Sequence, residues 1–279
     1  MSDPASSVIT ATFDDRDPVW SRLRDDATGL AASEPTLASF VHATILGHQR
    51  FDQALTYHLA QKLASPDVGS LYVHEIFDGA FGASASLNTA ARADLVAIYD
   101  RDPAVGTLVE PFLFFKGYHA LQAYRVTHWL WTNDRTALAL HFQSRVSEVF
   151  AVDIHPAARI GSGVMIDHGT GVVIGETAVV EDDVSLLQGV TLGGTGKEHG
   201  DRHPKVRRGV MIGAGAKVLG NTEIGAYSRI GAGSVVLRPV PPGSTAVGVP
   251  ARVIGEAGSE RPAEEMDHLI ALGPDDYVI

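Results

Sequence analysis

Hydrophobic residues follow two different periods along this chain, and the change falls near residue 150. Before it, apolar residues recur at i, i+3, i+4 and i+7, as in the segment from Pro35 to Ala64. This spacing is typical of amphipathic helices that bury one face. Asp102-Pro103 and Glu110-Pro111 indicate helix boundaries, because a residue before proline avoids the helical conformation. We therefore predict six to eight helices within residues 1–150.

Residues 151–255 repeat with a period of six instead. From Ile154 to Val190, and again from Val206 to Val236, every sixth residue is Ile or Val, apart from Ala178. Neither a helix nor a single strand has this period. It is typical of a hexapeptide β-helix, in which the repeated β-branched residue fills a narrow prism. Each buried Ile or Val stabilises such a prism by about 1.5–3 kcal/mol.

The two series of repeats are sixteen residues apart, so ten residues are inserted between them. The insertion falls around Thr195–Lys205 and carries histidine, lysine, arginine and aspartate side chains. An insertion in a solenoid leaves the core as a loop on one face, which is often the binding face. We expect the chemistry of the protein near this loop.

Composition and charge argue against several classes of protein. The net charge of −11 disfavours binding to a nucleic acid or to an anionic membrane. The chain has no cysteine, which excludes disulfides, thiolate metal sites and cysteine nucleophiles. Its acidic first residues differ from the basic start and apolar core of a signal peptide. We expect a cytoplasmic protein without a membrane-spanning segment.

Several motifs, taken together, resemble those of the bacterial serine O-acetyltransferase family. They are DIHPAA from Asp153, DHGTGVVIGET from Asp167, GGTGKEHGDRHPK from Gly193, RDPAV from Arg101 and KGYHALQAYRVTHWLW from Lys116. The resemblance implies an α+β fold, with an α-helical oligomerisation domain over residues 1–150 and a left-handed parallel β-helix over residues 151–255. It also implies homotrimers that join in pairs as a dimer of trimers.

The resemblance implies transfer of an acetyl group from acetyl-CoA, as co-substrate, to L-serine, a step of cysteine biosynthesis that needs no metal. A serine hydroxyl is a weak nucleophile and needs a general base within about 3 Å. His168 occupies the matching position, and an imidazole suits the role because its ordinary pKa lies near 6.5. Asp153 matches the carboxylate that orients this imidazole. Since fifteen residues separate the two, three short of an eighteen-residue coil, we expect them near one corner on successive coils.

Serine is a zwitterion, so its pocket needs charges of both signs. In the family pattern Asp102 and Asp167 can bind the ammonium group, Arg202 can bind the carboxylate, and His203 completes the set. A groove for acetyl-CoA is expected along small residues at equivalent corners of the coils. The residues expected to line it are Gly194, Thr195, Gly213, Ala214, Lys217 and Ala232.

Three other interpretations stay open at this point. Another hexapeptide acyltransferase would keep the repeat and the base but act on a different small acceptor. A zinc enzyme of the γ-carbonic-anhydrase type could use His155, His168 and His203 as ligands, although a structural role for His155, as a cap of the first coil, is the simpler assignment. A regulatory scaffold without activity would not need Asp153 and His168.

The last residues, 256–279, are acidic and contain glycine and proline, so we predict a flexible acidic C-terminal tail. The tail ends in Ile279, an apolar residue with a free carboxylate. The resemblance implies that Ile279 docks into the active site of O-acetylserine sulfhydrylase, and the alternative is an ordinary solvated tail. The resemblance also implies feedback inhibition by L-cysteine, which shares the ammonium and carboxylate groups of serine.

Overall fold

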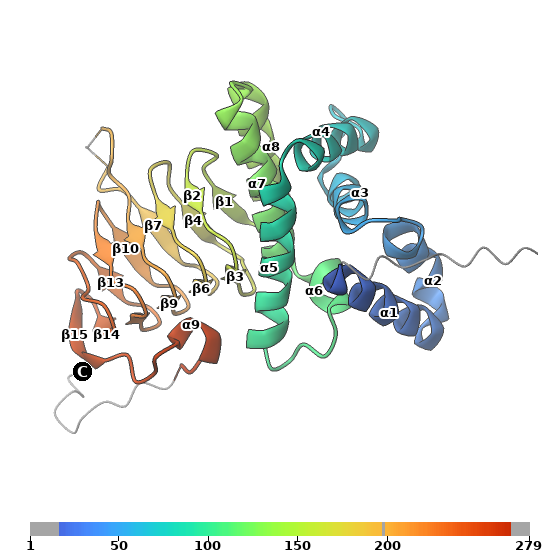
Figure 1. The fold of residues 1–279 in the computed structure, drawn as a ribbon. Helices are drawn as coiled ribbons and strands as arrows, with labels where there is room; N and C mark the ends of the chain where they lie inside the picture. Colours follow the sequence, from blue (N-terminus) through green and yellow to red (C-terminus); the bar gives the residue numbers. More distant parts are fainter. Residues whose placement is uncertain (1–16, 197–198, 269–279) are drawn as a thin grey trace, which may run out of the picture.

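The first part of the molecule is helical. The computed structural model describes residues 17–196 and 199–268 (Figure 1). Residues 17–150 contain a 3₁₀ turn (Pro35–Leu37), a π-helical turn (His42–Leu46) and eight α-helices, which confirms the predicted number. The α-helices are α1 (Pro18–Ser33), α2 (Ala38–Val41), α3 (Phe51–Leu63), α4 (Ser70–Ala83), α5 (Ala85–Arg101), α6 (Val109–Phe114), α7 (Lys116–Thr132) and α8 (Thr136–Phe150).

Helix α7 joins the helical part to the β-helix. It packs against α4, α5 and α8 and also against the first strands of the β-helix (Figure 1). A buried ion pair fixes α5 beside it: Arg125 of α7 donates to Asp94 of α5 at 2.7 Å, and Asp94 also accepts from the backbone N–H of Val164 at 3.0 Å. Arg101, the last residue of α5, donates to the Ser185 hydroxyl of the second coil at 3.1 Å, so Asp102, which follows α5, is held beside the β-helix.

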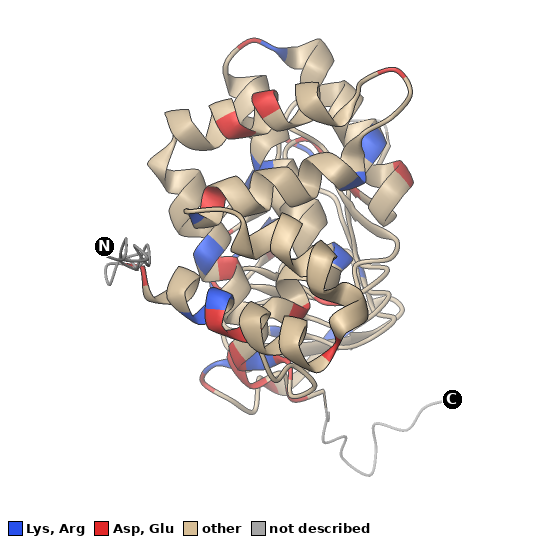
Figure 2. Cartoon of the chain, turned by 90° about the vertical axis from the view of Figure 1, so that its right-hand side faces the viewer, with Lys and Arg blue, Asp and Glu red and all other residues tan. Residues whose placement is uncertain are grey.

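Basic and acidic residues alternate along the helical part. Figure 2 shows short Lys or Arg segments and short Asp or Glu segments distributed among uncharged residues along the helices, without a long run of basic residues. Within residues 17–196 and 199–268, no helix has the length and apolar character needed to cross a membrane.

The second part is a parallel β-helix with three sheets, which confirms the expected α+β fold. Sheet A contains β1 (Val152–Ile154), β4 (Val172–Ile174), β7 (Thr191–Gly193), β10 (Lys217–Leu219) and β13 (Val235–Val236). Sheet B contains β2 (Arg159–Ile160), β5 (Val179–Val180), β8 (Lys205–Val206) and β11 (Glu223–Ile224). Sheet C contains β3 (Met165–Ile166), β6 (Ser185–Leu186), β9 (Met211–Ile212), β12 (Arg229–Ile230), β14 (Ser244–Gly248) and the antiparallel β15 (Ala251–Glu256).

The coils differ in length, and this corrects the predicted register. Partner residues on neighbouring strands of sheet A are 20, 18, 26 and 18 residues apart. The ten extra residues are therefore divided: two enter the first coil, in the loop 167–171, and eight enter the third, between Leu192 and Val206. As a result Ile174, rather than Val172, stacks on Ile154. The predicted series from Val172 to Val190 is buried, but it occupies a second inward position of each coil.

The described part of the predicted tail is packed rather than flexible. After β15 the chain turns back along sheet C and forms a short helix, α9 (Pro262–Glu265), in which Ala263 is buried. The Ser185 hydroxyl donates to the Ala263 carbonyl oxygen at 2.8 Å, and Arg229 donates to the Asp267 carbonyl oxygen at 3.0 Å. Pro262 begins the helix, because the first turn does not need its missing N–H. Residues 269–279, with Ile279, lie outside the described residues.

Two buried histidines in the helical part couple its stability to pH. The rings of His58 (α3) and His119 (α7) are 4.9 Å apart, and each Nε2 lies 3.1 Å or less from a carbonyl oxygen of α6. Burial lowers the pKa of His58 to about 4, and the charge of Lys62 also lowers it. Burial likewise holds the pKa of His119 well below 6.5.

We expect the free energy of unfolding to fall as the pH is lowered from 6.5 to 4. The unfolded chain, whose histidines titrate near their ordinary pKa, takes up protons before the folded chain does, and His58 alone accounts for up to roughly 3 kcal/mol. Above pH 7 the contribution stays constant. Urea unfolding at pH 7.5, 6.0 and 5.0 measures this change. His58→Gln should be less sensitive to acid, and an unchanged pH dependence in that variant would contradict the assignment.

Candidate active site

The predicted site residues of the β-helix border one face of the prism, sheet A. We call the loops that lead from sheet C into sheet A the C–A corner; they are residues 167–171, 187–190, 213–216 and 231–234. The loops from sheet A into sheet B form the A–B corner; they are residues 155–158, 175–178, 194–204 and 220–222. His168 lies at the C–A corner, and Arg202 and His203 lie at the A–B corner.

The two extra residues of the first coil raise His168 out of the C–A corner. Its backbone is left-handed, with φ of +55°, and the glycines at 169 and 171 are left-handed too. The loop is anchored where the Gly171 N–H donates to the Ala151 carbonyl oxygen at 2.7 Å. The side chain of His168 is 73% exposed. A left-handed residue other than glycine is uncommon, and such positions cluster at functional sites.

Helix α7 begins directly against this loop. A Cβ on Gly117 would stand 2.0 Å from the carbonyl oxygen of Ile166, so only glycine permits the approach. Next to it, the Lys116 ammonium donates to the hydroxyl of Thr170. The helical part therefore sets the position of the loop that carries His168.

Asp167 places a carboxylate beside His168, and the Asp102 carboxylate is close enough to Asp167 to act on it electrostatically. Asp102 follows α5, and its Oδ1 accepts from the Ala104 N–H at 2.9 Å. One carboxylate oxygen of Asp167 lies 3.8 Å from Nε2 of His168. Burial raises the pKa of Asp167, the neighbouring His168 lowers it, and the Asp102 carboxylate raises it again. Two carboxylates that repel each other stabilise a cation placed between them, and an α-ammonium group fits this description.

At the A–B corner, Thr177 holds both Arg202 and His203. Its hydroxyl accepts from the backbone N–H groups of these two residues at 3.0 and 3.1 Å. Nδ1 of His203 accepts from the Thr177 N–H at 3.2 Å, so the neutral ring carries its proton on Nε2. Burial and the charge of Arg202 lower the pKa of His203, whereas Glu176 raises it. Thr177 was not predicted as a site residue, although it ends the motif that begins at Asp167.

The Arg202 guanidinium already has a carboxylate partner in this structure. It donates to Glu176 at 2.6 Å, and this hydrogen bond holds the pKa of Glu176 below its usual range. Glu176 belongs to the same motif, which begins at Asp167, but it was not predicted as a site residue. It orients the guanidinium, which keeps further N–H groups for an incoming carboxylate.

One chain does not bring the two halves of the predicted serine site together. A three-residue strand spans about 10 Å, so the width of sheet A separates the C–A corner from the A–B corner. Asp102, Asp167 and His168 are on one side of it, and Arg202 and His203 are on the other. This distance exceeds the length of a serine molecule.

Asp153 lies on the outer face of β1, but its hydrogen bond goes to the helical part. Its Oδ1 accepts from Nε2 of Gln143 on α8 at 2.7 Å, and within the described residues no hydrogen bond joins it to His168. Because the first coil has twenty residues, the spacing of fifteen leaves the pair five residues short of one coil rather than three. His155 caps the A–B corner as expected, since its Nδ1 accepts from the Ala157 N–H at 3.1 Å.

The residues expected to line the acetyl-CoA groove do not share equivalent corners, which corrects that prediction. Gly194 and Thr195 belong to the A–B corner, whereas the other small residues belong to the C–A corner. Lys217 lies between them on β10, and its ammonium donates to the Gly189 carbonyl oxygen. Gly213 is needed for stacking, because a Cβ there would stand 2.7 Å from the backbone nitrogen of the next coil.

A column of residues at the C–A corner leads from the loop of His168 toward the last coil. Each member precedes a left-handed glycine, and the members are Thr170, Gln188, Ala214 and Ala232. Gln188 has the one long side chain of the column, and its Oε1 is buried without a hydrogen-bond partner among the described residues. Leaving a buried acceptor unpaired costs about 1–3 kcal/mol. Gln188 was not predicted, although its register with Ala214 and Ala232 would have indicated it.

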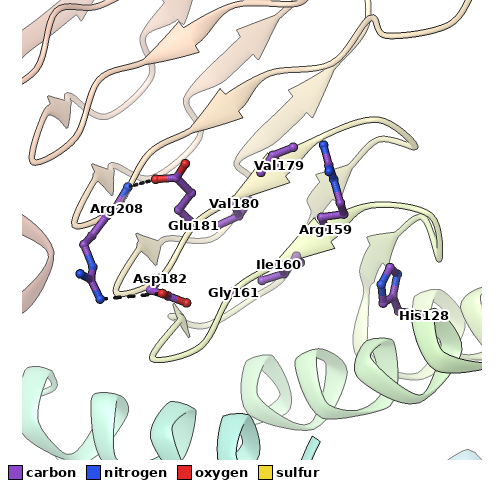
Figure 3. A pocket seen from close by; sticks show the side chains of 9 residues that line it. All are labelled: His128, Arg159, Ile160, Gly161, Val179, Val180, Glu181, Asp182 and Arg208. Carbon is purple, nitrogen blue, oxygen red and sulfur yellow. Dashed lines mark hydrogen bonds and ion pairs between the residues drawn. The ribbon is translucent and has the colours of Figure 1, made fainter. Parts of the chain in front are cut away.

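Two adjoining grooves elsewhere contain none of the predicted site residues. Their volumes are about 470 and 460 Å³; the first lies over sheet B, the second lies between α5, α7 and the loop after β2, and His128 of α7 and Asp182 line both. Figure 3 shows the first groove, in which Glu181 accepts from the backbone N–H of Arg208 at 3.0 Å and Asp182 forms an ion pair with the Arg208 guanidinium at 3.8 Å. Both carboxylates already have partners, so we assign the grooves no role.

The three histidines proposed as zinc ligands do not converge in one chain. His155 and His203 lie at the A–B corner and His168 lies at the C–A corner. Over residues 17–196 and 199–268, no group of three His, Asp or Glu side chains is arranged to hold a metal ion.

Comparison with known proteins gives one consistent family. A family model described as the N-terminal part of serine acetyltransferase matches residues 19–123, and a model of bacterial transferase hexapeptide repeats matches residues 203–238. The serine acetyltransferases of Salmonella typhimurium and Escherichia coli are 57% and 56% identical over 249 residues, which cover 89% of this chain and 91% of each relative.

Solved structures of serine acetyltransferases superpose closely. One in complex with cysteine is 55% identical, with a TM-score of 0.89 and coverage of 91% of this chain and 98% of that one. The Brucella abortus enzyme in complex with coenzyme A is 50% identical, with a TM-score of 0.85 and coverage of 87% and 97%. The soybean enzyme complexed with serine is 52% identical, with a TM-score of 0.83 and coverage of 85% and 97%. With this identity over most of its length, the chain belongs to the serine acetyltransferase family and is an acyltransferase.

Proposed function

We propose that this protein transfers the acetyl group of acetyl-CoA to the hydroxyl of L-serine, with His168 as the general base. The observation that carries the proposal is the raised loop at the C–A corner, which exposes an imidazole beside the carboxylate of Asp167, with the carboxylate of Asp102 close enough to act on Asp167. The carboxylates bind the serine ammonium group and so place the hydroxyl near His168. The soybean relative is described in complex with serine, which supports this choice of acceptor.

The reaction then follows from these groups. His168 takes the hydroxyl proton as the serine oxygen attacks the thioester carbonyl carbon, and the tetrahedral intermediate collapses with loss of the coenzyme A thiolate. The protonated imidazole returns its proton to this thiolate. Asp153 orients the imidazole and stabilises its charged form.

The serine carboxylate is bound by Arg202 and His203 of a second copy of the chain. These residues lie across sheet A from His168, so a copy related by rotation can place its A–B corner against the C–A corner of the first. Closed rotation of three copies gives one such site at each interface. This supports the trimer, and pairing of trimers through their helical parts gives the dimer of trimers.

Acetyl-CoA is proposed to lie along the column of Thr170, Gln188, Ala214 and Ala232 at the C–A corner. The arm of coenzyme A has amide N–H groups, and the buried Oε1 of Gln188 lacks a donor. Ala214 and Ala232 continue the column without bulk, and Lys217 adds a positive charge on sheet A. The Brucella relative is described in complex with coenzyme A, which supports this co-substrate.

The remaining biological roles are proposals of the same kind. L-cysteine keeps the ammonium and carboxylate of serine, and a relative is described in complex with cysteine, so we propose competitive feedback at the serine site. The product, O-acetyl-L-serine, would serve cysteine biosynthesis in the cytoplasm. Docking of Ile279 into O-acetylserine sulfhydrylase stays a proposal about residues outside the described part.

Thiol release from acetyl-CoA, measured with L-serine and with a panel of other small hydroxyl acceptors, tests the reaction. L-serine should be the preferred acceptor. A different preferred acceptor would favour another hexapeptide acyltransferase with the same base.

Mixing two inactive variants tests whether the site is shared between copies. His168→Ala and Arg202→Ala chains, assayed at low serine concentration, should each be nearly inactive alone. When they are coexpressed in equal amounts with different tags, about a quarter of all sites, or one of the three sites in each mixed trimer, combine an intact His168 with an intact Arg202, and activity should recover to that extent. Coexpression of two tagged His168→Ala chains is the control and should recover nothing. Mixed oligomers without activity would refute the shared site.

A further inference from the structure

Gln143 contacts the carboxylate that the proposed mechanism assigns to orienting His168. It lies on α8, the last helix before the β-helix, and its Nε2 donates to Oδ1 of Asp153 at 2.7 Å. Between them the chain turns at Ala151, whose backbone is left-handed with φ of +56°. A side chain of the helical part thus reaches past this turn to a residue of the first strand.

Asp153 has few other constraints on its orientation. It lies on the outer face of β1, in register with Val173, which has no polar group to hold it. The residues around it offer the carboxylate other directions: His155 interacts with it electrostatically, and a crevice of 440 Å³ opens beside it, lined in part by Ser144 and Ser147. Without Gln143, the carboxylate could turn into this crevice or toward His155.

A hydrogen bond to one oxygen restricts this freedom. With Oδ1 held by the Gln143 amide at 2.7 Å, the carboxylate is kept from turning away and Oδ2 stays available to a second donor. An amide donor is also neutral, so it leaves the negative charge of Asp153 uncompensated and available to an imidazolium. A lysine or arginine in place of Gln143 would neutralise that charge instead.

We infer that Gln143 is a positioning residue for acetyl transfer, because it fixes Asp153 so that the second carboxylate oxygen can meet the imidazole of His168. The inference rests on the roles proposed above for Asp153 and His168. Gln143 itself touches neither substrate. Its effect should therefore appear in turnover rather than in binding.

The first test replaces Gln143 with leucine, which keeps the size of the side chain and removes the donor. kcat should fall roughly 10- to 100-fold, because a small misplacement of a catalytic group is enough for such a loss. KM for L-serine and for acetyl-CoA should change by less than about threefold. Gln53→Leu is the matched control, since the Gln53 side chain accepts from the Gln49 N–H far from this site, and its kcat should be normal.

A double-mutant cycle separates positioning from a merely structural role. In an Asp153→Asn background the carboxylate is already lost, so adding Gln143→Leu should lower kcat by less than about twofold. A further loss as large as in the wild-type background would overturn the inference, because Gln143 would then act without Asp153.

A second variant keeps the test decisive if the leucine variant is poorly folded. Gln143→Glu places a carboxylate beside Asp153 and should raise the pKa of the pair, so the acid limb of the kcat–pH profile should move to higher pH. An acid limb that stays in place would count against the inference.

The outcomes also distinguish this inference from the proposed function. If Asp153→Asn alone has normal turnover, the proposed role of Asp153 fails and the inference fails with it. If Asp153→Asn is impaired while Gln143→Leu turns over normally, only the inference fails.

Discussion

Replacing His168 with alanine should lower turnover by about 100- to 10,000-fold, which is the usual contribution of a general base. The serine hydroxyl then has no proton acceptor at the C–A corner, since the neighbouring carboxylates are expected to bind the ammonium group. The fold should not change, because the side chain is 73% exposed and makes no hydrogen bond within the described part of the chain. Steady-state thiol release measures the turnover, and the melting temperature and the mass of the oligomer show whether the fold is kept.

The control for this experiment is His42→Ala, which removes an exposed histidine of the helical part. That variant should turn over normally. A well-folded His168→Ala protein with nearly normal kcat would remove the base from the proposed mechanism.

Replacing Asp94 with asparagine should lower the free energy of unfolding by about 3–5 kcal/mol, because it leaves a buried arginine without its counter-charge. Asp94 is fully buried, and it accepts hydrogen bonds from Arg125, Gln122 and the backbone of Val164. Since this cluster ties α5 and α7 to the first coil, the variant should also raise KM for serine by displacing Asp102. Urea unfolding and serine titration measure the two effects.

A surface ion pair provides the contrast. Glu223→Gln removes one partner of Arg207 on sheet B, where solvent screens the interaction, so the unfolding midpoint should barely move. If Asp94→Asn also left the unfolding midpoint unchanged, the buried cluster around Asp94 would not be what holds the helical part on the β-helix.

The period of six predicts the β-helix because every coil repeats the same inward positions. The period of six misplaces Val172 because each strand has two inward positions, two residues apart, and aliphatic residues occupy both. A shift from one to the other keeps the pattern of Ile and Val intact. Ala178 marks the shift, since the position two residues later holds the larger Val180. The insertion that carries His168 was therefore hidden within an apparently regular series.

The motifs predicted which residues could act in catalysis and binding, but they did not predict which of these residues lie together in the folded chain. Residues of one motif stay together, which is why Asp167 lies beside His168. The side of sheet A on which each motif lies depends on where the extra residues fall, and a regular period does not encode that. The partners of Asp153 and Asp94 depend on how α7 and α8 dock on the first coil. Such contacts join residues with no shared pattern, so the sequence alone did not predict them.

The return of residues 257–268 along sheet C has a consequence for the order of folding. Helix α9 packs against α5, and Ala263 accepts a hydrogen bond from Ser185 of the second coil. These two partners are 78 residues apart along the chain. Closing so long a loop costs more conformational entropy than forming local contacts, so such contacts form late. We therefore expect α9 to dock only after α5 and the coils of the β-helix have formed.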